Sequence, residues 1–218
     1  MQLHEIIIFM GPPGSGKGTQ TKLFSYSTGY AYFSTGALSR EYAKQDSDFG
    51  KRVKSIIDKG IILPIEIIRE IFVKKFESLL DSADGVILDG YPRTTEQAGL
   101  LEELMSKYGI MNLKAVFLDV DKEKLIKRLS NRKTCVNCQT MYKSDMPEYK
   151  KGVCGKCQGK LVMRADDDPS VIEKRFEEYL NKTAPVREYY ENKGSLIHIN
   201  GDQSIESVHK DILKAIRQ

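Results

Sequence analysis

The sequence contains no tryptophan, only 3 histidines and no strong excess of either charge. Its 34 basic and 30 acidic residues leave a formal net charge of +4, so composition does not demand a nucleic-acid platform, whereas a small phosphate-rich ligand suits this balance. The histidines, His4, His198 and His209, are isolated from one another in the sequence, and we assign them no role.

Long hydrophobic runs are missing too. The apolar run at residues 6–10 is far too short to span a membrane, and no basic segment precedes it as in a signal peptide. We therefore expect a cytoplasmic protein with no membrane or nucleic-acid partner. The sequence does not determine the oligomeric state, and we take a monomer as the expectation.

Cysteine is absent outside residues 135–157, where 4 cysteines form two Cys-x-x-Cys pairs. The pairs are Cys135 with Cys138 and Cys154 with Cys157. In a reducing compartment, this spacing favours a structural zinc site of four thiolates over two disulfides or an iron–sulfur cluster. Because four cysteines leave no open coordination position, we predict that the metal stiffens its segment and takes no part in catalysis.

Short β-branched runs alternate with longer helical patterns, which predicts one α/β domain whose parallel sheet is flanked by helices. Strands are predicted at 5–10, 31–34, 85–89, 115–119 and 195–199. Helices are predicted at 17–28, 36–44, 48–59, 64–80, 94–108, 121–132, 169–191 and 204–216. Thr94, Asp121 and Asp168 are the expected N-caps, with Gln97 completing a capping box, and Pro185 should break or kink the long helix.

Two segments do not fit simple strand–helix alternation. Residues 34–63 place two helices between strands, and residues 131–167 hold the cysteines without helical periodicity. We interpret both as insertions over one end of the sheet. The core is then formed by residues 1–33, 64–130 and 168–218.

Residues 11–19, Gly-Pro-Pro-Gly-Ser-Gly-Lys-Gly-Thr, connect the first predicted strand to the first predicted helix. A glycine-rich loop in this context brings backbone N–H groups and a helix N-terminus to a polyphosphate, and Lys17 adds a mobile cation. We therefore predict a site for the triphosphate of ATP or GTP, in preference to an ordinary glycine-rich turn. Because Gly18 stands where the strict pattern has Ser or Thr, direct magnesium ligation by the Thr19 hydroxyl is not expected.

A carboxylate and an arginine follow the strand predicted at 85–89, in the order Asp89-Gly90-Tyr91-Pro92-Arg93. A carboxylate at the C-terminal end of a parallel strand faces the ligand crevice, where it can hold magnesium through water. A purely structural Asp-Gly turn is the alternative. Ser34-Thr35-Gly36 with Arg40 fits either an anion site or a helix cap beside a solvated arginine.

Several further arginines are spaced so that they can meet at one site. Arg128 and Arg132 lie four apart on the predicted helix 121–132 and would share a face. Phosphoryl transfer needs positioning and neutralisation of charge more than covalent chemistry, and guanidinium groups supply both. The candidates for one anionic crevice are Arg40, Arg93, Arg128, Arg132, Arg164 and Arg175.

In combination these motifs resemble the adenylate kinase family. The resemblance rests on residues 11–19, on Ser34-Thr35-Gly36 with Arg40, on residues 89–94 with Gln97, and on Arg164-Ala165-Asp166-Asp167. It covers nearly the whole chain, and its spacing is similar to the bacterial long form with a zinc-binding lid. The resemblance implies the P-loop nucleoside-monophosphate kinase fold and reversible, Mg²⁺-dependent transfer of a phosphoryl group from ATP to AMP.

The resemblance also implies roles for individual residues. The ATP site would comprise Gly14, Ser15, Gly16, Lys17, Gly18, Thr19, Arg128, Arg132, Met141, Tyr142 and Gln203. The AMP site would comprise Thr35, Arg40, Ile61, Ile62, Leu63, Gly90, Tyr91, Pro92, Arg93, Gln97, Arg164 and Arg175, with Gln97 facing adenine. The catalytic groups would be Lys17, Asp89, Arg93, Arg128, Arg132, Arg164 and Arg175.

The sequence departs from the family pattern at two positions, and three other functions stay open. Ala37 stands where the family usually has Asp, which removes part of the expected magnesium network, and Tyr91 replaces the commoner Phe. The alternatives are a UMP/CMP kinase, a non-catalytic nucleotide sensor and a nucleic-acid-binding ATPase with a zinc ribbon. The mild net charge argues against the last.

Overall fold

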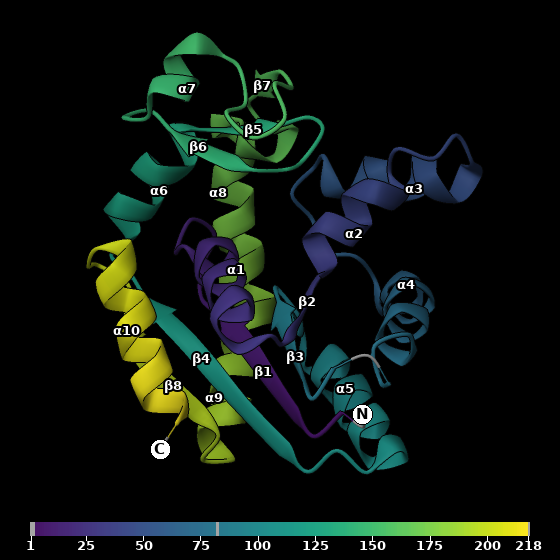
Figure 1. Cartoon of the computed structure of the whole chain (residues 1–218). Coiled ribbons are helices and arrows are strands. Elements are labelled where there is room, and N and C mark those ends of the chain that lie inside the picture. Colours follow the sequence, from purple (N-terminus) through teal and green to yellow (C-terminus); the bar gives the residue numbers. More distant parts are fainter. Residues whose placement is uncertain (1–2, 82, 218) are drawn as a thin grey trace.

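A five-stranded parallel sheet forms the centre of the molecule, in the order β2-β3-β1-β4-β8 (Figure 1). The computed structural model describes residues 3–81 and 83–217. The strands are β1 (Glu5–Met10), β2 (Ala31–Ser34), β3 (Gly85–Asp89), β4 (Asn112–Asp119) and β8 (Leu196–Asn200). The parallel sheet predicted from the sequence is confirmed. β4 begins three residues before its apolar run because Asn112 and Lys114 pair with β1 through their backbones.

Helices cover both faces of this sheet. They are α1 (Lys17–Thr28), α4 (Ile65–Glu77), α5 (Thr95–Tyr108), α6 (Lys122–Ser130), α8 (Pro169–Glu178), α9 (Ala184–Asn192) and α10 (Ile205–Ile216). Along β1, Ile6 and Ile8 belong to the hydrophobic cluster under α4, α5 and α9, whereas Ile7 and Phe9 belong to the cluster under α1 and α10. A strand buried on both faces needs a continuous apolar run, which is what residues 6–10 provide.

The first insertion follows β2 and consists of α2 (Thr35–Tyr42) and α3 (Asp48–Ile57). Ser34 caps α2 by accepting a hydrogen bond from the backbone N–H of Ala37, and Ser47 caps α3. Figure 1 shows this pair of helices standing to one side of the sheet, with the cysteine-containing segment on the other side of the same end.

The second insertion, which we call the lid (residues 131–167), forms a small antiparallel sheet of order β6-β5-β7. Its elements are β5 (Arg132–Cys135), β6 (Met141–Lys143), α7 (Pro147–Lys151), β7 (Leu161–Val162) and the 3₁₀ turn η1 (Ala165–Asp167). The helix predicted at 121–132 ends at Ser130, so the expectation that Arg128 and Arg132 share a helix face is wrong. Arg132 instead starts β5 and pairs with Lys143, since strand pairing in the lid overrides the small helix propensity of arginine.

The predicted helix ends are largely as expected. Thr94, Asp121 and Asp168 each accept a hydrogen bond from the backbone of their helix. Gln97 completes only half of the capping box, because its carboxamide oxygen accepts from the N–H of Arg93 and not from that of Thr94. The long helix at 169–191 is interrupted by a π-helical turn, η2 (Tyr179–Thr183), and resumes as α9 with Pro185 in its first turn, where proline costs no hydrogen bond.

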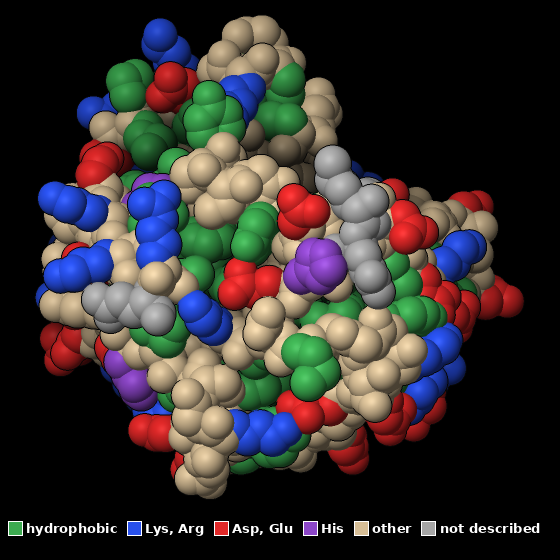
Figure 2. Space-filling view, turned by 60° about the horizontal axis from the view of Figure 1, so that its bottom comes forward, with side chains coloured by type: hydrophobic (Ala, Val, Ile, Leu, Met, Phe, Trp, Pro, Cys, Tyr) green, Lys and Arg blue, Asp and Glu red, His purple; other side chains and the backbone are tan. Residues whose placement is uncertain are grey.

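Two features of the surface bear on partners. Within residues 3–81 and 83–217, none of the helices is both long and apolar enough to cross a membrane. On the face opposite the lid, Lys and Arg side chains lie among Asp and Glu, with hydrophobic side chains between them (Figure 2). That face therefore presents no basic stripe of the kind that nucleic-acid binding requires.

Candidate functional site

A cavity of about 890 Å³ lies at the carboxyl ends of the core strands, between the first insertion and the lid. Its wall includes the glycine-rich loop, Asp89, and groups from β5 and β6. All six arginines singled out from the sequence line it: Arg40, Arg93, Arg128, Arg132, Arg164 and Arg175. A cavity of this size with so many guanidinium groups is suited to a polyanion larger than a single phosphate.

The glycine-rich loop adopts the shape that its composition predicts. Gly14 and Gly16 have φ of 83° and 98°, and a Cβ on Gly14 would lie 2.9 Å from the carbonyl oxygen of Leu125. Lys17 folds back over the loop, where its ammonium donates to the carbonyl oxygens of Gly11 at 2.6 Å and Pro12 at 2.8 Å. The loop is therefore wrapped around a cation at the N-terminus of α1, which is a ready anion site.

The protein alone stabilises the charge of Lys17 poorly. Burial lowers its pKa to about 7; the carboxylate of Asp89 opposes the shift, while Arg93 and Arg175 add to it. An anion bound beside the ammonium would supply the missing counter-charge and raise the pKa again. Binding of a phosphate should therefore favour the protonated, fully charged form of Lys17.

Asp89 ends β3 directly beside this loop. A Cβ on Gly18 would lie 3.4 Å from its Oδ2 atom, which places the carboxylate over the start of α1. The same oxygen accepts a hydrogen bond of 2.9 Å from the hydroxyl of Tyr32 on β2. Burial, followed by the charge of Asp89, raises the pKa of Tyr32, so this hydroxyl stays a donor. Sequence reasoning placed Asp89 at the crevice but gave no sign of Tyr32.

Three of the arginines are held by two aspartates at the junction of lid and core. Asp167, which is fully buried, accepts from Arg132 at 2.5 and 2.6 Å and from Arg175 at 2.6 Å. Asp166 accepts from Arg164 at 2.8 and 2.5 Å. Burial alone would raise the pKa of Asp166, but Arg164 and Arg175 outweigh it and hold that pKa at about 2. The motif at 164–167 was recognised in the sequence, yet the role of its two aspartates in holding these arginines was missed.

Arg40 and Arg93 differ from those three because neither forms an ion pair with a carboxylate among the described residues. Burial lowers the pKa of Arg40 to about 10, and its Nε atom is buried without a hydrogen-bond partner. Burial also lowers the pKa of Arg93, whose Nε donates to the carbonyl of Gly90 at 2.8 Å. Two guanidinium groups that are desolvated and lack a directly paired carboxylate indicate where a bound anion is most strongly needed.

The other residues that the resemblance assigns to AMP fall into two groups. Ile62, Gly90 and Pro92 line the cavity, whereas the following do not: Thr35, Ile61, Leu63, Tyr91 and Gln97. Thr35 donates to the carbonyl of Gly90 at 2.8 Å and so braces the loop after β3. Gln97 is buried beneath that loop, where its Nε2 makes a long bond of 3.5 Å to the carbonyl of Leu63.

On the opposite side the cavity is lined by Met141, Tyr142 and Gln203, all named from the sequence. Gln203 donates to Asp211 and to the carbonyl of Asn200. Arg128 contacts the carbonyl of Gly201 at 3.3 Å and the carboxylate of Asp202 at 3.5 Å. Asp202 was missed, although a carboxylate two residues after the last strand of a parallel sheet was a usable signal.

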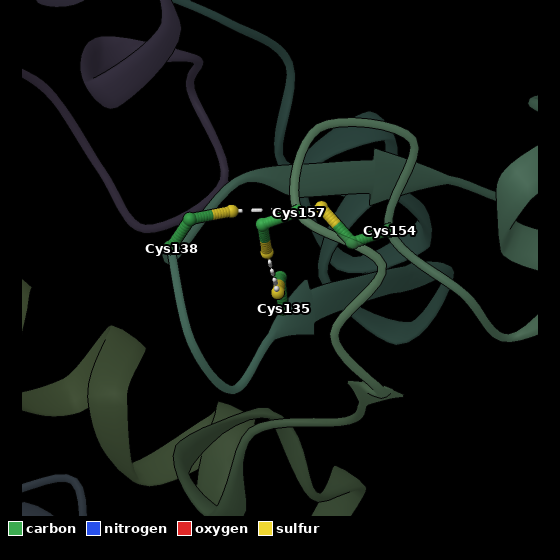
Figure 3. Close-up of side chains that lie close together, drawn as sticks. All are labelled: Cys135, Cys138, Cys154 and Cys157. Carbon is green, nitrogen blue, oxygen red and sulfur yellow. Dashed lines mark hydrogen bonds between the residues drawn. The ribbon is translucent and has the colours of Figure 1, made fainter.

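The four cysteines come together in the lid, as their spacing predicts (Figure 3). Their sulfur atoms all lie within 4.8 Å of one another, and two of the separations are 3.4 and 3.5 Å. These distances are too long for disulfide bonds, which the free thiols confirm. Four sulfurs around one zinc at about 2.3 Å would be about 3.8 Å apart, so the cluster fits tetrahedral zinc.

Both cysteine pairs use the same tight turn. In each, the residue after the second cysteine has a left-handed backbone, with φ of 57° at Gln139 and 58° at Gln158. Its N–H donates to the carbonyl of the first cysteine, at 3.1 Å in one pair and 2.9 Å in the other. Gly159 follows the second turn, and a Cβ there would come within 2.8 Å of the Cys135 sulfur. The backbone is thus shaped around the sulfurs.

Comparison with known proteins agrees with this geometry. A model of the adenylate kinase family matches residues 9–195. Among curated proteins, the chain is 39% identical over 211 residues to an adenylate kinase of Dehalococcoides mccartyi, covering 97% of each chain. It is also similar to adenylate kinases of Desulforamulus reducens and Thermosipho melanesiensis, at 39% and 37% identity, over 97% of this chain and 99% of each relative.

Proposed function

Because the chain belongs to the adenylate kinase family, we propose that its large cavity binds ATP and AMP together, with their phosphates meeting between Lys17 and the six arginines. The chain is a nucleoside-monophosphate kinase that transfers a phosphoryl group reversibly from ATP to AMP and forms two ADP. The convergence of these seven cations on one cavity is the observation that carries the assignment of residues.

We assign the ATP phosphates to the glycine-rich loop, Gly14 to Thr19. Its N–H groups and the N-terminus of α1 would hold the β- and γ-phosphates, while Lys17 exchanges the carbonyls of Gly11 and Pro12 for phosphate oxygens. The base and ribose would lie toward Arg128, Met141, Tyr142 and Gln203, which line the other end of the cavity.

The AMP phosphate is assigned to Arg40 and Arg93, because these two buried arginines lack a carboxylate partner. The loops of residues 61–63 and 90–92, braced by Thr35, would enclose the rest of the nucleotide. Gln97 would face the adenine edge by exchanging its long bond to Leu63 for one to the base. A site that depends on such a buried hydrogen bond rejects bases that leave it unpaired.

The moving phosphoryl group is assigned to Arg132, Arg164 and Arg175. Asp166 and Asp167 already hold these side chains in place, so little reorganisation is needed when charge develops on the phosphoryl oxygens. Magnesium bound with ATP would add charge neutralisation on the β- and γ-phosphates, and Asp89 is placed to hold it through water.

The zinc-binding lid, residues 131–167, would close over the nucleotides and exclude water, so that AMP rather than solvent accepts the phosphoryl group. Arg132, Met141 and Tyr142 come from this segment and line the cavity. A four-cysteine zinc site would keep these side chains in register without entering the reaction. The monomeric state and the cytoplasmic location stay predictions.

The test is a panel of acceptors with Mg·ATP and purified protein: AMP, UMP, CMP and GMP. AMP should have the highest kcat/KM, and both ATP and AMP should be converted to ADP. Equal or higher kcat/KM with UMP or CMP would support the UMP/CMP kinase instead. Nucleotide binding without ADP formation would support a sensor.

A further inference from the structure

Tyr32 contacts the acidic residue of the nucleotide site, although no motif includes it. Its side chain lines the main cavity from β2, and its hydroxyl donates to Oδ2 of Asp89 at 2.9 Å. In the register of the two strands, Tyr32 pairs with Ile87 and Ser34 pairs with Asp89. Because side chains two residues apart share a face of the sheet, this diagonal contact follows from the strand pairing.

Among the described residues that follow Tyr32, no other side chain is seen to donate to the Asp89 carboxylate, and Thr35 reaches only the backbone carbonyl of Asp89. The hydroxyl of Ser34 is used to cap the N–H of Ala37 at 3.3 Å, and Ala37 itself lines the cavity with a methyl group. Within residues 3–81 and 83–217, Tyr32 is the one side chain whose hydrogen bond to the Asp89 carboxylate is seen. Lys17 and Arg93 interact with the charge of this carboxylate, but the Tyr32 hydroxyl is the group that directs it by a hydrogen bond.

That hydroxyl is well placed to fix the carboxylate. A hydrogen bond from a neutral donor to an ionised acceptor is among the stronger ones, and a bond to Oδ2 limits rotation of the side chain. The fixed carboxylate lies beside Gly18, at the start of the helix that follows the phosphate loop. A carboxylate that must meet a hydrated cation gains from such fixation, since less rotational freedom is lost on binding.

We propose that Tyr32 is a positioning residue that holds Asp89 toward the magnesium of Mg·ATP. Ala37 cannot share this role, because its methyl side chain forms no hydrogen bond. This inference rests on the proposed function of the cavity. It predicts that the Tyr32 hydroxyl affects the contribution of magnesium to nucleotide binding and leaves the binding of the phosphates themselves unchanged.

The chain provides a matched control. Tyr30, two residues earlier, donates to the carboxylate of Glu5 at 2.7 Å, and neither residue lines the cavity. Tyr30→Phe and Tyr32→Phe each remove one hydroxyl from one tyrosine–carboxylate pair and keep the ring. Any general effect of losing such a pair should appear in both variants.

The experiment measures the dissociation constant of ATP by calorimetry, with and without Mg²⁺, in the wild type and both variants. The ratio of the constant without Mg²⁺ to that with Mg²⁺ should fall by about tenfold in Tyr32→Phe, as expected for losing one hydrogen bond to a charged group. The constant without Mg²⁺ should stay within about twofold of the wild type. Tyr30→Phe should keep the wild-type ratio.

The Mg²⁺ concentration for half-maximal turnover should rise in Tyr32→Phe alone. An unchanged ratio, or an equal loss of affinity with and without Mg²⁺, would overturn the role of Tyr32. Failure of the wild type to form ADP from ATP and AMP would overturn the proposed function instead, so the two failures are distinguishable.

Discussion

The core and the lid are held together by different means and depend on different ligands. The core has two large hydrophobic clusters on the faces of its sheet. The buried cluster of the lid consists of Cys135, Tyr142, Cys154 and Leu161, so half of it is cysteine. The core lines the cavity with cations such as Lys17, Arg93 and Arg175, which need an anion. The lid adds Arg132 and Arg164 to that cavity and, apart from them, gathers four sulfurs that need a cation. The core should fold without its ligand, and the lid should not fold without its metal.

Loss of the metal is expected to have the largest effect, because it should unfold the lid and leave the core folded. Zinc contributes on the order of 10 kcal/mol to folding of small zinc peptides that lack a core. Cys135→Ser with Cys138→Ser should abolish a content of about one zinc per chain and make residues 131–167 sensitive to protease. The core should keep its helices and its hydrophobic clusters. Turnover should weaken where the stripped lid is disordered and partly recover on cooling.

Metal analysis and limited proteolysis followed by mass spectrometry measure these effects directly. Val136→Ala with Asn137→Ala changes the same turn without removing a sulfur and should keep the zinc. A purified wild type that holds no metal, with four reactive thiols and full activity, would contradict the structural-zinc proposal.

The next largest effect is expected where the two regions meet. Asp167 is fully buried and joins Arg132 on β5 to Arg175 on α8. Asp167→Asn would leave two buried guanidinium groups without that charge, which typically costs about 3–5 kcal/mol. Urea unfolding should show this loss. Asp168→Asn is the matched control, since the exposed Asp168 is an N-cap and asparagine caps almost equally well. Equal stabilities of the two variants would show that the junction does not depend on Asp167.

The two regions also differ in how far their structure follows from sequence. β1, β2 and β3 match their predicted bounds. For β1 and β3, the reason is that a continuous apolar run fits a central strand of a parallel sheet, which is buried on both faces. The lid strands are two to four residues long and carry no apolar alternation, so only the cysteine spacing predicted structure there. Arg132 was placed on a helix because its pairing with Lys143 depends on a contact across the lid.

The same limit applies within the site. The phosphate loop, Asp89 and the arginines are recognisable because each lies in a local motif, and the structure brings all of them to one cavity. Tyr32 and Asp167 act through partners 57 and 35 residues away, which no local pattern shows. Gln97 was expected to face a base, whereas its side chain contacts the N–H of Arg93 and the carbonyl of Leu63 and so braces the loop after β3.

Removing the ammonium group of Lys17 should lower turnover and leave both the core and the lid folded. Lys17→Met deletes the ammonium that contacts the loop carbonyls but keeps a side chain of similar length. Turnover should fall by about 100-fold or more, the scale of losing one preorganised electrostatic group. Circular dichroism and zinc content should stay close to those of the wild type, and the unfolding temperature should not fall. Near-normal turnover in the folded variant would contradict the assignment of the phosphate loop.

The smallest expected effect is a proton taken up by the core when ATP binds. Since burial lowers the pKa of Lys17 to about 7, its side chain should be largely in the neutral amine form at pH 8 when no ligand is bound. Bound phosphate raises that pKa, so Mg·ATP binding at pH 8 should take up close to one proton, and at pH 6 little from this group.

Calorimetry in buffers of different ionisation enthalpy measures the uptake, and Lys17→Met corrects for protons exchanged by ATP itself. Stability should follow the same group with a definite sign. The folded pKa lies below the unfolded value of 10.5, so between about pH 7 and 10.5 the unfolded chain binds more protons. Across that window Lys17 therefore makes the nucleotide-free protein more stable as pH rises, and Lys17→Met should flatten the rise. Equal proton uptake by the variant and the wild type would show that Lys17 keeps its charge without a ligand. The charge of this lysine would then not depend on a bound anion, in contrast to the proposed dependence of the lid on its metal.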